Sequence, residues 1–202
     1  GRWSTSSPTL LVVDRPVSPA FLADCCRMQH STHVSALQVV RLLFTSAGTQ
    51  ALLGYRLGRR LTLLRDTGKL PLLRPFGWLL YWLINGYTRA AHDIHLELTA
   101  DIGPGLYIGH FGNIVVRNCR IGSHCSIHQS VHLEPAGDDR GPVIGGHVWI
   151  GPHAQVIGPY HVGDGCTVSA GAVVSRDIPS RSLFMGNPGR VIMQEYDNSD
   201  IL

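Results

Sequence analysis

Charged side chains are scarce in this chain. Asp, Glu, Lys and Arg make up only 15% of the 202 residues, and the formal net charge is +3. A protein that binds nucleic acid usually presents a dense basic face, so the composition argues against a nucleic-acid partner. The few local arginines can still bind a small anionic ligand.

The chain has only five cysteines and no C-x-x-C pair: Cys25, Cys26, Cys119, Cys125 and Cys166. An odd number without paired spacing argues against a disulfide framework and favours a reducing compartment. The first residues also contain no basic segment followed by an apolar core, so we expect no secretory signal. These features predict a cytoplasmic protein.

No uncharged apolar run is long enough to span a membrane. The longest is PFGWLLYWLINGYT, at residues 75–88, whereas a spanning helix needs about 20 residues. We predict a buried core helix here, with contact at a membrane surface as the alternative.

The first half has the apolar spacing of amphipathic helices. We expect an α-helical region over residues 35–94, with helices at 36–47, 49–65 and near 76–91, and assign no structure to residues 1–34. In the second helix a leucine stripe lies opposite most of the arginines: Leu53, Leu57, Leu61 and Leu64 against Arg56, Arg59 and Arg60. Thr49 is the expected N-cap and Gly68 the expected stop.

From residue 96 onward the apolar residues follow a period of six. The anchors shift by one residue from Ile114 to Val115 and are interrupted at 134–143; they are Leu96, Ile102, Ile108, Ile114, Ile121, Ile127, Leu133, Ile144, Ile150, Val156, Val162, Val168 and Val174. This period is typical of a β-solenoid with inward-pointing anchors, each contributing about 1.5–3 kcal/mol of burial. Cys119, Cys125 and Cys166 occupy the small corner position, so we interpret them as packing residues.

The repeats resemble those of the hexapeptide-repeat acyltransferases, on the stretches YRLGRRL, IGPGLYIGHFGNIVV, IGSHCSIHQSVHL, VIGGHVWIGPHAQVIG and GNPGRVI. The resemblance is greatest to the serine O-acetyltransferase group, particularly the branch with capsular and colanic acid O-acetyltransferases. It implies a mainly β protein with a left-handed parallel β-helix, placed here at residues 95–180 and followed by a C-terminal extension at 181–202. It also implies a homotrimer that uses acetyl-CoA as the acyl donor. In the closing motif, Gly189 replaces the family's alanine.

His110 is the candidate general base. It lies two residues after anchor Ile108, where a side chain faces outward, beside Gly109 and Gly112. Periodicity alone leaves a solvated histidine equally open, whereas IGPGLYIGH aligns with the family segment that ends in the catalytic histidine. A neutral imidazole can take the proton of an attacking hydroxyl and return it to the departing thiolate.

Several positions depart from the serine acetyltransferase pattern. Gly109 replaces the aspartate that precedes the catalytic histidine, and His95 stands where an aspartate orients the imidazole. Glu97 and Asp93 flank His95, and either is a candidate to take over that orienting role. The resemblance places Asp139 and Arg140 at the acceptor, in a loop that reads D-R-G-P instead of D-R-H-P. We therefore expect a sugar or secondary-metabolite hydroxyl as the acceptor, with free serine as the alternative.

The resemblance also places the donor. The CoA arm would lie in a groove between subunits, along Trp149, Gly151, Pro152, Ser169 and Ala170. Arg176 and Arg190 are candidate partners of the nucleotide phosphates, although solvated surface charges are an equal alternative for both.

Two other classes of function stay open. Eleven histidines are many, and the same fold hosts zinc carbonic anhydrases; however, His124, His128 and His132 fall at different hexad positions and point in different directions, so we expect no metal. Stoichiometric zinc, lost with activity on chelation, would favour the anhydrase. A solenoid scaffold without activity would not bind CoA.

Overall fold

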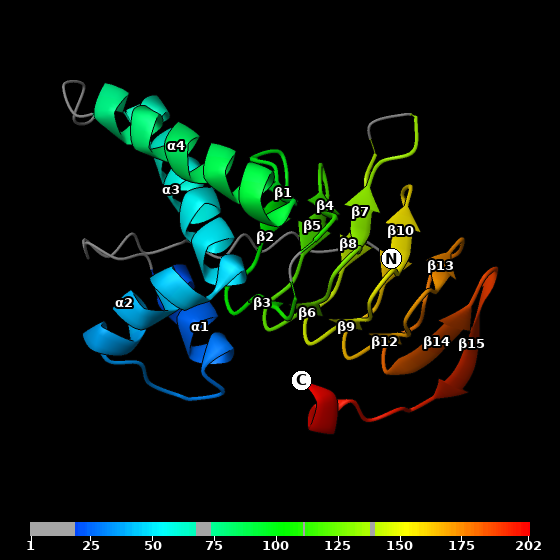
Figure 1. Cartoon of the computed structure of the whole chain (residues 1–202). Helices are drawn as coiled ribbons and strands as arrows, with labels where there is room; N and C mark the ends of the chain where they lie inside the picture. Colours follow the sequence, from blue (N-terminus) through cyan, green and yellow to red (C-terminus); the bar gives the residue numbers. More distant parts are fainter. Residues whose placement is uncertain (1–18, 68–73, 111, 138–139) are drawn as a thin grey trace.

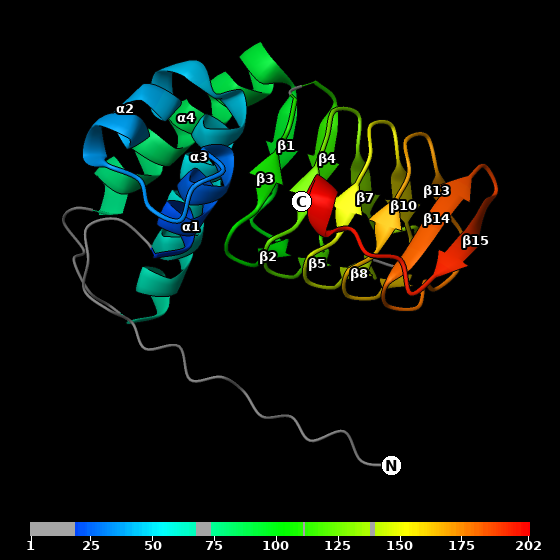
Figure 2. The same ribbon diagram turned by 90° about the horizontal axis from the view of Figure 1, so that it is seen from below.

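The computed structural model describes residues 19–67, 74–110, 112–137 and 140–202. A group of four helices packs against one end of a prism of short parallel strands (Figure 1). In the view from below, the helices cover the first coil and the strands run away from them in successive turns (Figure 2). The architecture is a parallel β-solenoid with an N-terminal helical region, as the hexad pattern predicts.

The helices are α1 (Pro19–Met28), α2 (Ala36–Thr45), α3 (Ala47–Thr67) and α4 (Arg74–His92). The last three confirm the helices expected from apolar spacing, whereas α1 lies in the segment to which the sequence assigned no structure. The prediction that Thr49 is the N-cap of its helix is wrong, because Thr49 lies inside α3. Its N–H donates to the Ser46 hydroxyl at 3.2 Å, so Ser46 has the capping role. Gly68 lies outside the described residues.

Helices α1 and α3 are joined to the first coil by a buried ion pair. Arg56 Nε lies 2.9 Å from Asp24 Oδ2, and the Arg56 guanidinium also donates to the carbonyls of Ile102 and Gly103, both at 2.6 Å. Asp24 accepts the N–H groups of Gly105 and Leu106 at 2.8 and 3.0 Å. Arg56 therefore faces the solenoid, which corrects its expected place on the outer side of the helix.

The apolar run at 75–88 forms the expected helix but does not make the expected buried core. One face of α4 carries exposed side chains, among them Phe76 and Trp82 at 70% and 71% exposure, and Leu37 and Phe44 of α2 are also exposed. A pocket of about 430 Å³ opens among α2, α3 and α4, lined mostly by leucines, Phe44 and Tyr87. Periodicity showed the helix, but the burial of a face depends on what packs against it. No described helix is long and apolar enough to cross a membrane.

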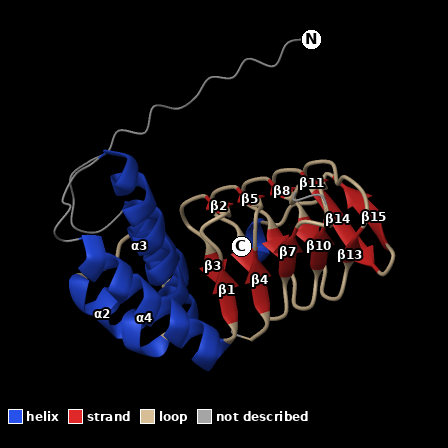
Figure 3. Ribbon diagram, turned by 90° about the horizontal axis from the view of Figure 1, so that it is seen from above, coloured by secondary structure: helices blue, strands red, loops and turns tan. Residues whose placement is uncertain are grey.

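Three sheets form the faces of the prism, and Figure 3 shows the strands of successive coils side by side along its length. The first contains β1 (Ile94–Leu96), β4 (Ile114–Val116), β7 (His132–Glu134), β10 (Gln155–Ile157) and β13 (Val173–Val174). The second contains β2 (Asp101–Ile102), β5 (Arg120–Ile121), β8 (Val143–Ile144) and β11 (His161–Val162). The third contains β3 (Tyr107–Ile108), β6 (Ser126–Ile127), β9 (Trp149–Ile150), β12 (Thr167–Val168), β14 (Ser182–Gly186) and β15 (Gly189–Gln194), of which only the β14–β15 pair is antiparallel.

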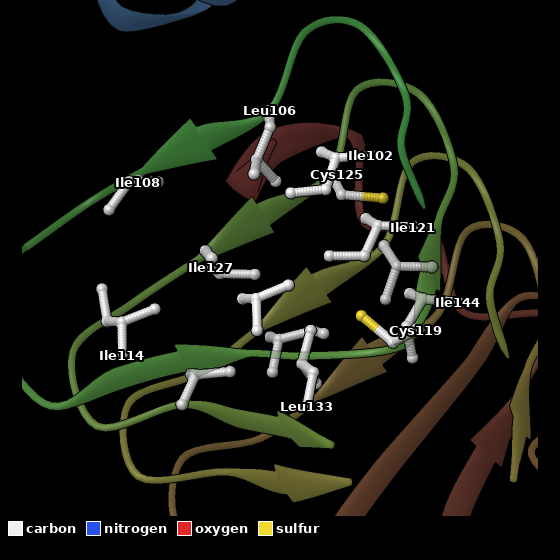
Figure 4. Close-up of a cluster of buried hydrophobic side chains, with 14 of the residues drawn as sticks. Ile102, Leu106, Ile108, Ile114, Cys119, Ile121, Cys125, Ile127, Leu133 and Ile144 are labelled. Carbon is white, nitrogen blue, oxygen red and sulfur yellow. The ribbon is translucent and has the colours of Figure 1, made fainter. Parts of the chain in front are cut away.

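The anchors point into the prism and stack as ladders (Figure 4). In the third sheet, Ile108 pairs with Ile127, Ile127 with Ile150, and Ile150 with Val168. One anchor needs correction: Val116 is fully buried and pairs with Leu133, whereas Val115 is half-buried on the outer side. The residue that occupies the anchor position on this strand therefore lies two residues after Ile114, not one. Cys119, Cys125 and Cys166 are buried at corners, as expected, and burial raises the pKa of each thiol.

At the corner between the second and third sheets, one residue of each described coil has a left-handed backbone conformation. Gly105, His124, His147, Gly165 and Arg181 occupy it, with φ values of 76°, 56°, 54°, 66° and 55°. This conformation disfavours most side chains. The imidazoles of His124 and His147 stack there, with ring centroids 5.2 Å apart.

The C-terminal segment returns toward the helices. Asn198 Nδ2 donates to the carbonyls of His147 and Cys166 at 2.9 and 3.2 Å, just before the short helix η1 (Ser199–Ile201). Arg27 of α1 donates to the Leu202 carbonyl at 3.1 Å and to the Ser126 hydroxyl at 3.0 Å. These contacts connect the helical region, the third sheet and the end of the chain.

Candidate active site

The candidate base and the candidate donor residues follow the strands of one sheet. Because Ile108, Ile127, Ile150 and Val168 are in register, the residues after them form two columns along one corner of the prism. The first column is Gly109, His128, Gly151 and Ser169; the second is His110, Gln129, Pro152 and Ala170. The fold therefore brings His110 to the same edge as four of the expected CoA contacts, although these residues are up to 60 positions apart in sequence.

His110 is exposed, directly after β3. The loop beyond it turns through Gly112 and Asn113, with φ values of 111° and 50°. Two hydrogen bonds hold this turn: the Ser130 N–H donates to the Gly112 carbonyl at 2.8 Å, and the Asn113 N–H donates to Asp93 Oδ2 at 3.0 Å. His110 itself is exposed at the rim of the site, just before this turn, where a ligand can reach it.

Asp93 has a closer connection to the His110 loop than either residue favoured from the sequence. Its second oxygen, Oδ1, lies 2.9 Å from Nε2 of His95, and Arg89 Nε donates to His95 Nδ1 at 3.1 Å. The Glu97 carboxylate accepts from the Thr99 hydroxyl at 3.4 Å. Among the described residues, no hydrogen bond joins His110 to His95 or Glu97. The turn at Asp93, with φ of 51°, is what directs this carboxylate toward the loop.

His128 lies directly beside the candidate base, one coil further along the prism. Its ring centroid is 6.4 Å from that of His110, 5.0 Å from that of Trp149 and 6.2 Å from that of Tyr107. Burial, and secondarily the nearby His110, lowers the pKa of His128 below its ordinary value. The sequence pattern pointed to His128 only as a possible metal ligand. Its position in the column below Gly109 is the signal that could have shown its relation to the site.

The donor residues form a tightly packed backbone surface. A Cβ at Gly151 would lie 2.6 Å from the Ala170 nitrogen and 2.7 Å from the Trp149 ring, so only glycine fits there. Pro152 accepts the Gly171 N–H at 2.8 Å, and the Ser169 N–H donates to Phe184 at 2.9 Å. Arg176 follows β13 in the first sheet and Arg190 lies on β15; both are exposed.

The acceptor loop is only partly described. Asp139 lies outside the described residues, and Arg140 is exposed. A Cβ at Gly141 would clash with the carbonyl oxygen of Asn118 on the neighbouring coil. The glycine at this position therefore permits a close approach of two backbones that the family's histidine would prevent in this arrangement.

The three histidines weighed as a metal site have separate surroundings. His124 stacks on His147, His128 contacts Trp149, and His132 lies 3.2 Å from the Asn113 side chain and 3.4 Å from Glu134. Across residues 19–67, 74–110, 112–137 and 140–202, no group of three potential metal ligands comes together.

The chain is similar to proteins of known family. The family described as "Bacterial transferase hexapeptide (six repeats)" matches residues 141–176. A serine acetyltransferase of Staphylococcus xylosus is 35% identical over 117 residues, which are 56% of this chain and 54% of that protein; one of Bacillus subtilis (strain 168) is 34% identical over 116 residues, 55% and 54% of the two. The chain thus spans about half the length of the curated relatives it matches.

Among solved structures, the soybean serine acetyltransferase apoenzyme is 31% identical. The similarity covers 86% of this chain and 67% of the soybean chain, with a TM-score of 0.66. The alignment therefore includes the helical region as well as the coils that carry the candidate site.

Proposed function

This chain belongs to the hexapeptide-repeat acyltransferases, and from that premise we propose that it transfers an acetyl group from acetyl-CoA to an alcohol. The observation that supports this most directly is the column geometry at the third sheet. An exposed imidazole, His110, stands at one end of a corner whose later coils offer the close-packed surface of Gly151, Pro152, Ser169 and Ala170.

The proposed reaction needs one base and no covalent enzyme intermediate. The acceptor oxygen attacks the thioester carbon while the neutral His110 imidazole takes the hydroxyl proton. The tetrahedral intermediate then collapses, the C–S bond breaks, and His110 returns the proton to the CoA thiolate. Asp93 supports this chemistry by fixing the turn that follows His110, through its hydrogen bond to Asn113. His95, Glu97 and Asp93 are the candidates named from the sequence for orienting the imidazole.

Two acceptors remain in view, each with its own support. The relatives are named serine acetyltransferases, which favours serine over the sugar or secondary-metabolite hydroxyl that we expected first. An uncharged acceptor, such as a sugar or secondary metabolite, keeps specific support from Gly109 and Gly141. These glycines stand where serine acetyltransferases carry an aspartate and a histidine. The finer assignment to the capsular and colanic acid branch is part of this second proposal.

We also propose that the protein is a homotrimer with the acceptor and donor sites formed between subunits. A triangular prism presents three flat sheets, and closed cyclic symmetry lets one sheet of each copy face the next.

A contact with a membrane surface would use the exposed apolar face of α2 and α4, and sedimentation with anionic vesicles tests for it. A cytoplasmic location is supported by the five cysteines, all of which are free thiols.

The decisive experiment follows thiol release from acetyl-CoA with serine, other amino alcohols, sugars and simple secondary alcohols. His110→Ala should lower transfer to every acceptor by about 10²–10⁴-fold, the range for loss of a general base, while CoA affinity measured by calorimetry stays unchanged. His161→Ala, an exposed histidine on β11 in the second sheet, is the control. Full activity in the His110 variant would refute the role of this base.

A further inference from the structure

Gly109 and His128 depend on one another. A Cβ at Gly109 would clash with Nδ1 of His128 and lie 2.6 Å from its Cε1. Real Cβ atoms do not approach other atoms so closely, because packed interiors tolerate little overlap. The absence of a side chain at 109 is therefore what lets the His128 imidazole occupy the space beside His110. On the other side of His128, the next residue in the column is again a glycine, Gly151.

The His128 ring is held by aromatic neighbours but has a polar atom without a partner. Tyr107 and Trp149 contact it from the strands before and after. Its Nε2 atom is out of contact with solvent and has no hydrogen-bond partner among the described residues. A buried polar atom left in this way is costly, and an acceptor hydroxyl that reached it in the complex would supply the missing hydrogen bond.

The two imidazoles are too far apart to bond to each other directly, since their centroids are separated by 6.4 Å and a hydrogen bond joins heavy atoms about 3 Å apart. A small polar group between the rings can contact both. His110 is the exposed member of the pair and His128 the half-buried one. An acceptor hydroxyl between them would meet an exposed ring that can remove its proton and a half-buried ring that can hold the molecule.

We propose that His128 is an acceptor-binding residue whose imidazole hydrogen-bonds to an uncharged hydroxyl of the acceptor beside His110. This inference rests on the proposed function and adds the chemical class of the acceptor at that position. The family's aspartate at position 109 would supply a negative charge suited to an ammonium group. Here that carboxylate has no room, and burial lowers the pKa of the neighbouring imidazole, which favours its neutral form. A neutral ring nitrogen, which is a donor or an acceptor according to the tautomer, suits the hydroxyl of a sugar or other polyol and offers no charge to the ammonium group of free serine.

The first test compares steady-state kinetics of the native protein, His128→Leu and His128→Gln with the best acceptor and with serine. Leucine keeps the bulk and loses the hydrogen bond, so the acceptor KM should rise about tenfold, the equivalent of about 1.4 kcal/mol. Glutamine restores a polar atom and should recover part of that loss. Acetyl-CoA KM should change much less, and circular dichroism should show that each variant is folded. His161→Gln is the matched control.

The outcomes separate the two proposals. If native protein acetylates no alcohol, the proposed function fails and this inference fails with it. If transfer occurs and requires His110, but His128→Leu leaves the acceptor KM unchanged, this inference alone is overturned. A native preference for serine over every uncharged alcohol also overturns it.

A second test uses the steric link between the two positions. Gly109→Asp alone should lose activity, because the new side chain collides with His128. The double variant Gly109→Asp with His128→Ala removes the collision and places a carboxylate beside His110. Its kcat/KM ratio for serine over an uncharged alcohol should rise about tenfold relative to native protein. Equal activity of native protein and the Gly109→Asp single variant would show that the two positions are not linked.

Discussion

Glycines decide several side-chain positions in this protein, and Gly189 is a clear case. It lies against the ring of Phe184, which is fully buried in the last coil. The family's alanine would place a methyl group into that ring and within 2.8 Å of the Val173 carbonyl oxygen. The residue that departs from the family motif is therefore matched to a large aromatic neighbour.

Gly189→Ala should destabilise the protein by about 1–3 kcal/mol, the cost of overpacking a filled core. The free energy of unfolding from urea denaturation measures this effect. Gly86→Ala is the opposite control, because a Cβ there meets nothing within 4 Å and alanine favours the α4 helix by about 1 kcal/mol. Equal stability of native protein and the Gly189 variant would mean that Phe184 moves aside at little cost.

The corner histidine His124 predicts a dependence of stability on pH. Burial, followed by the stacked His147, lowers the pKa of His124 from its ordinary value of 6.5. The unfolded chain then binds protons more readily, so the free energy of unfolding should fall as pH drops through about 6.5. His124→Asn tolerates the left-handed backbone and should reduce the fall in stability between about pH 7.5 and 5.5.

Urea titrations at several pH values check this, with His161→Asn as the control. An unchanged pH slope in the His124 variant would contradict the prediction.

At this scale the sequence predicted the outward direction of His110, because its distance from anchor Ile108 fixes it, whereas the choice of His110 as the base rests on the family resemblance. It named Asp93 only as a substitute for the aspartate that orients the imidazole, and it did not show the hydrogen bond of Asp93 to Asn113 or the place of His128 beside His110. Both depend on which residues lie side by side on neighbouring coils, and that depends on turn lengths. The coils differ by several residues in length, since Ile102, Ile121 and Ile144 occupy equivalent positions.

Among the elements, the contact of α1 and α3 with the first coil depends on Asp24. Its carboxylate is buried at 1% exposure and receives Arg56 and two backbone N–H groups. Asp24→Asn would leave the Arg56 charge without its partner in the interior. We expect a loss of about 3–5 kcal/mol in the free energy of unfolding, typical of a broken buried pair.

Asp101→Asn is the control for Asp24→Asn. Asp101 also pairs with an arginine of α3, Arg59, at 3.4 Å, but its side chain is 62% exposed. Exposed pairs contribute about 0–1 kcal/mol, so this change should have little effect on the urea midpoint. Similar losses in the two variants would show that the buried pair does not anchor the helices.

Element types were predictable because they depend on spacing. The periods of 3.6 and six residues separate α2–α4 from the strands without reference to tertiary structure. Helix α1 escaped notice because it has only ten residues and places a charged side chain, Asp24, on its buried face beside Phe21 and Cys25. Ser46 and Thr49 are both good capping residues, and only the observed hydrogen bond distinguishes them.

For the whole molecule, the proposed trimer gives a direct prediction. Light scattering coupled to gel filtration should yield a mass about three times the 22.0 kDa of one chain, at concentrations that also support transfer. A monomer mass with full activity would contradict a site shared between subunits.

At this scale the sequence predicted the prism from its hexads. It predicted the wrong surroundings for α4, because the exposure of a helix face depends on what packs against it, and the helix's own pattern does not show that.

The antiparallel hairpin at the last coil has a consequence for how copies of the protein meet. Strand β15 reverses direction against β14 and is six residues long, whereas the strands of the coils have two or three residues. A second molecule cannot continue the parallel ladder there in the same direction, and helices α1 and α3 cover the opposite end. Head-to-tail polymerisation into filaments is thus disfavoured at both ends, which leaves the flanks of the prism as the route to a finite assembly.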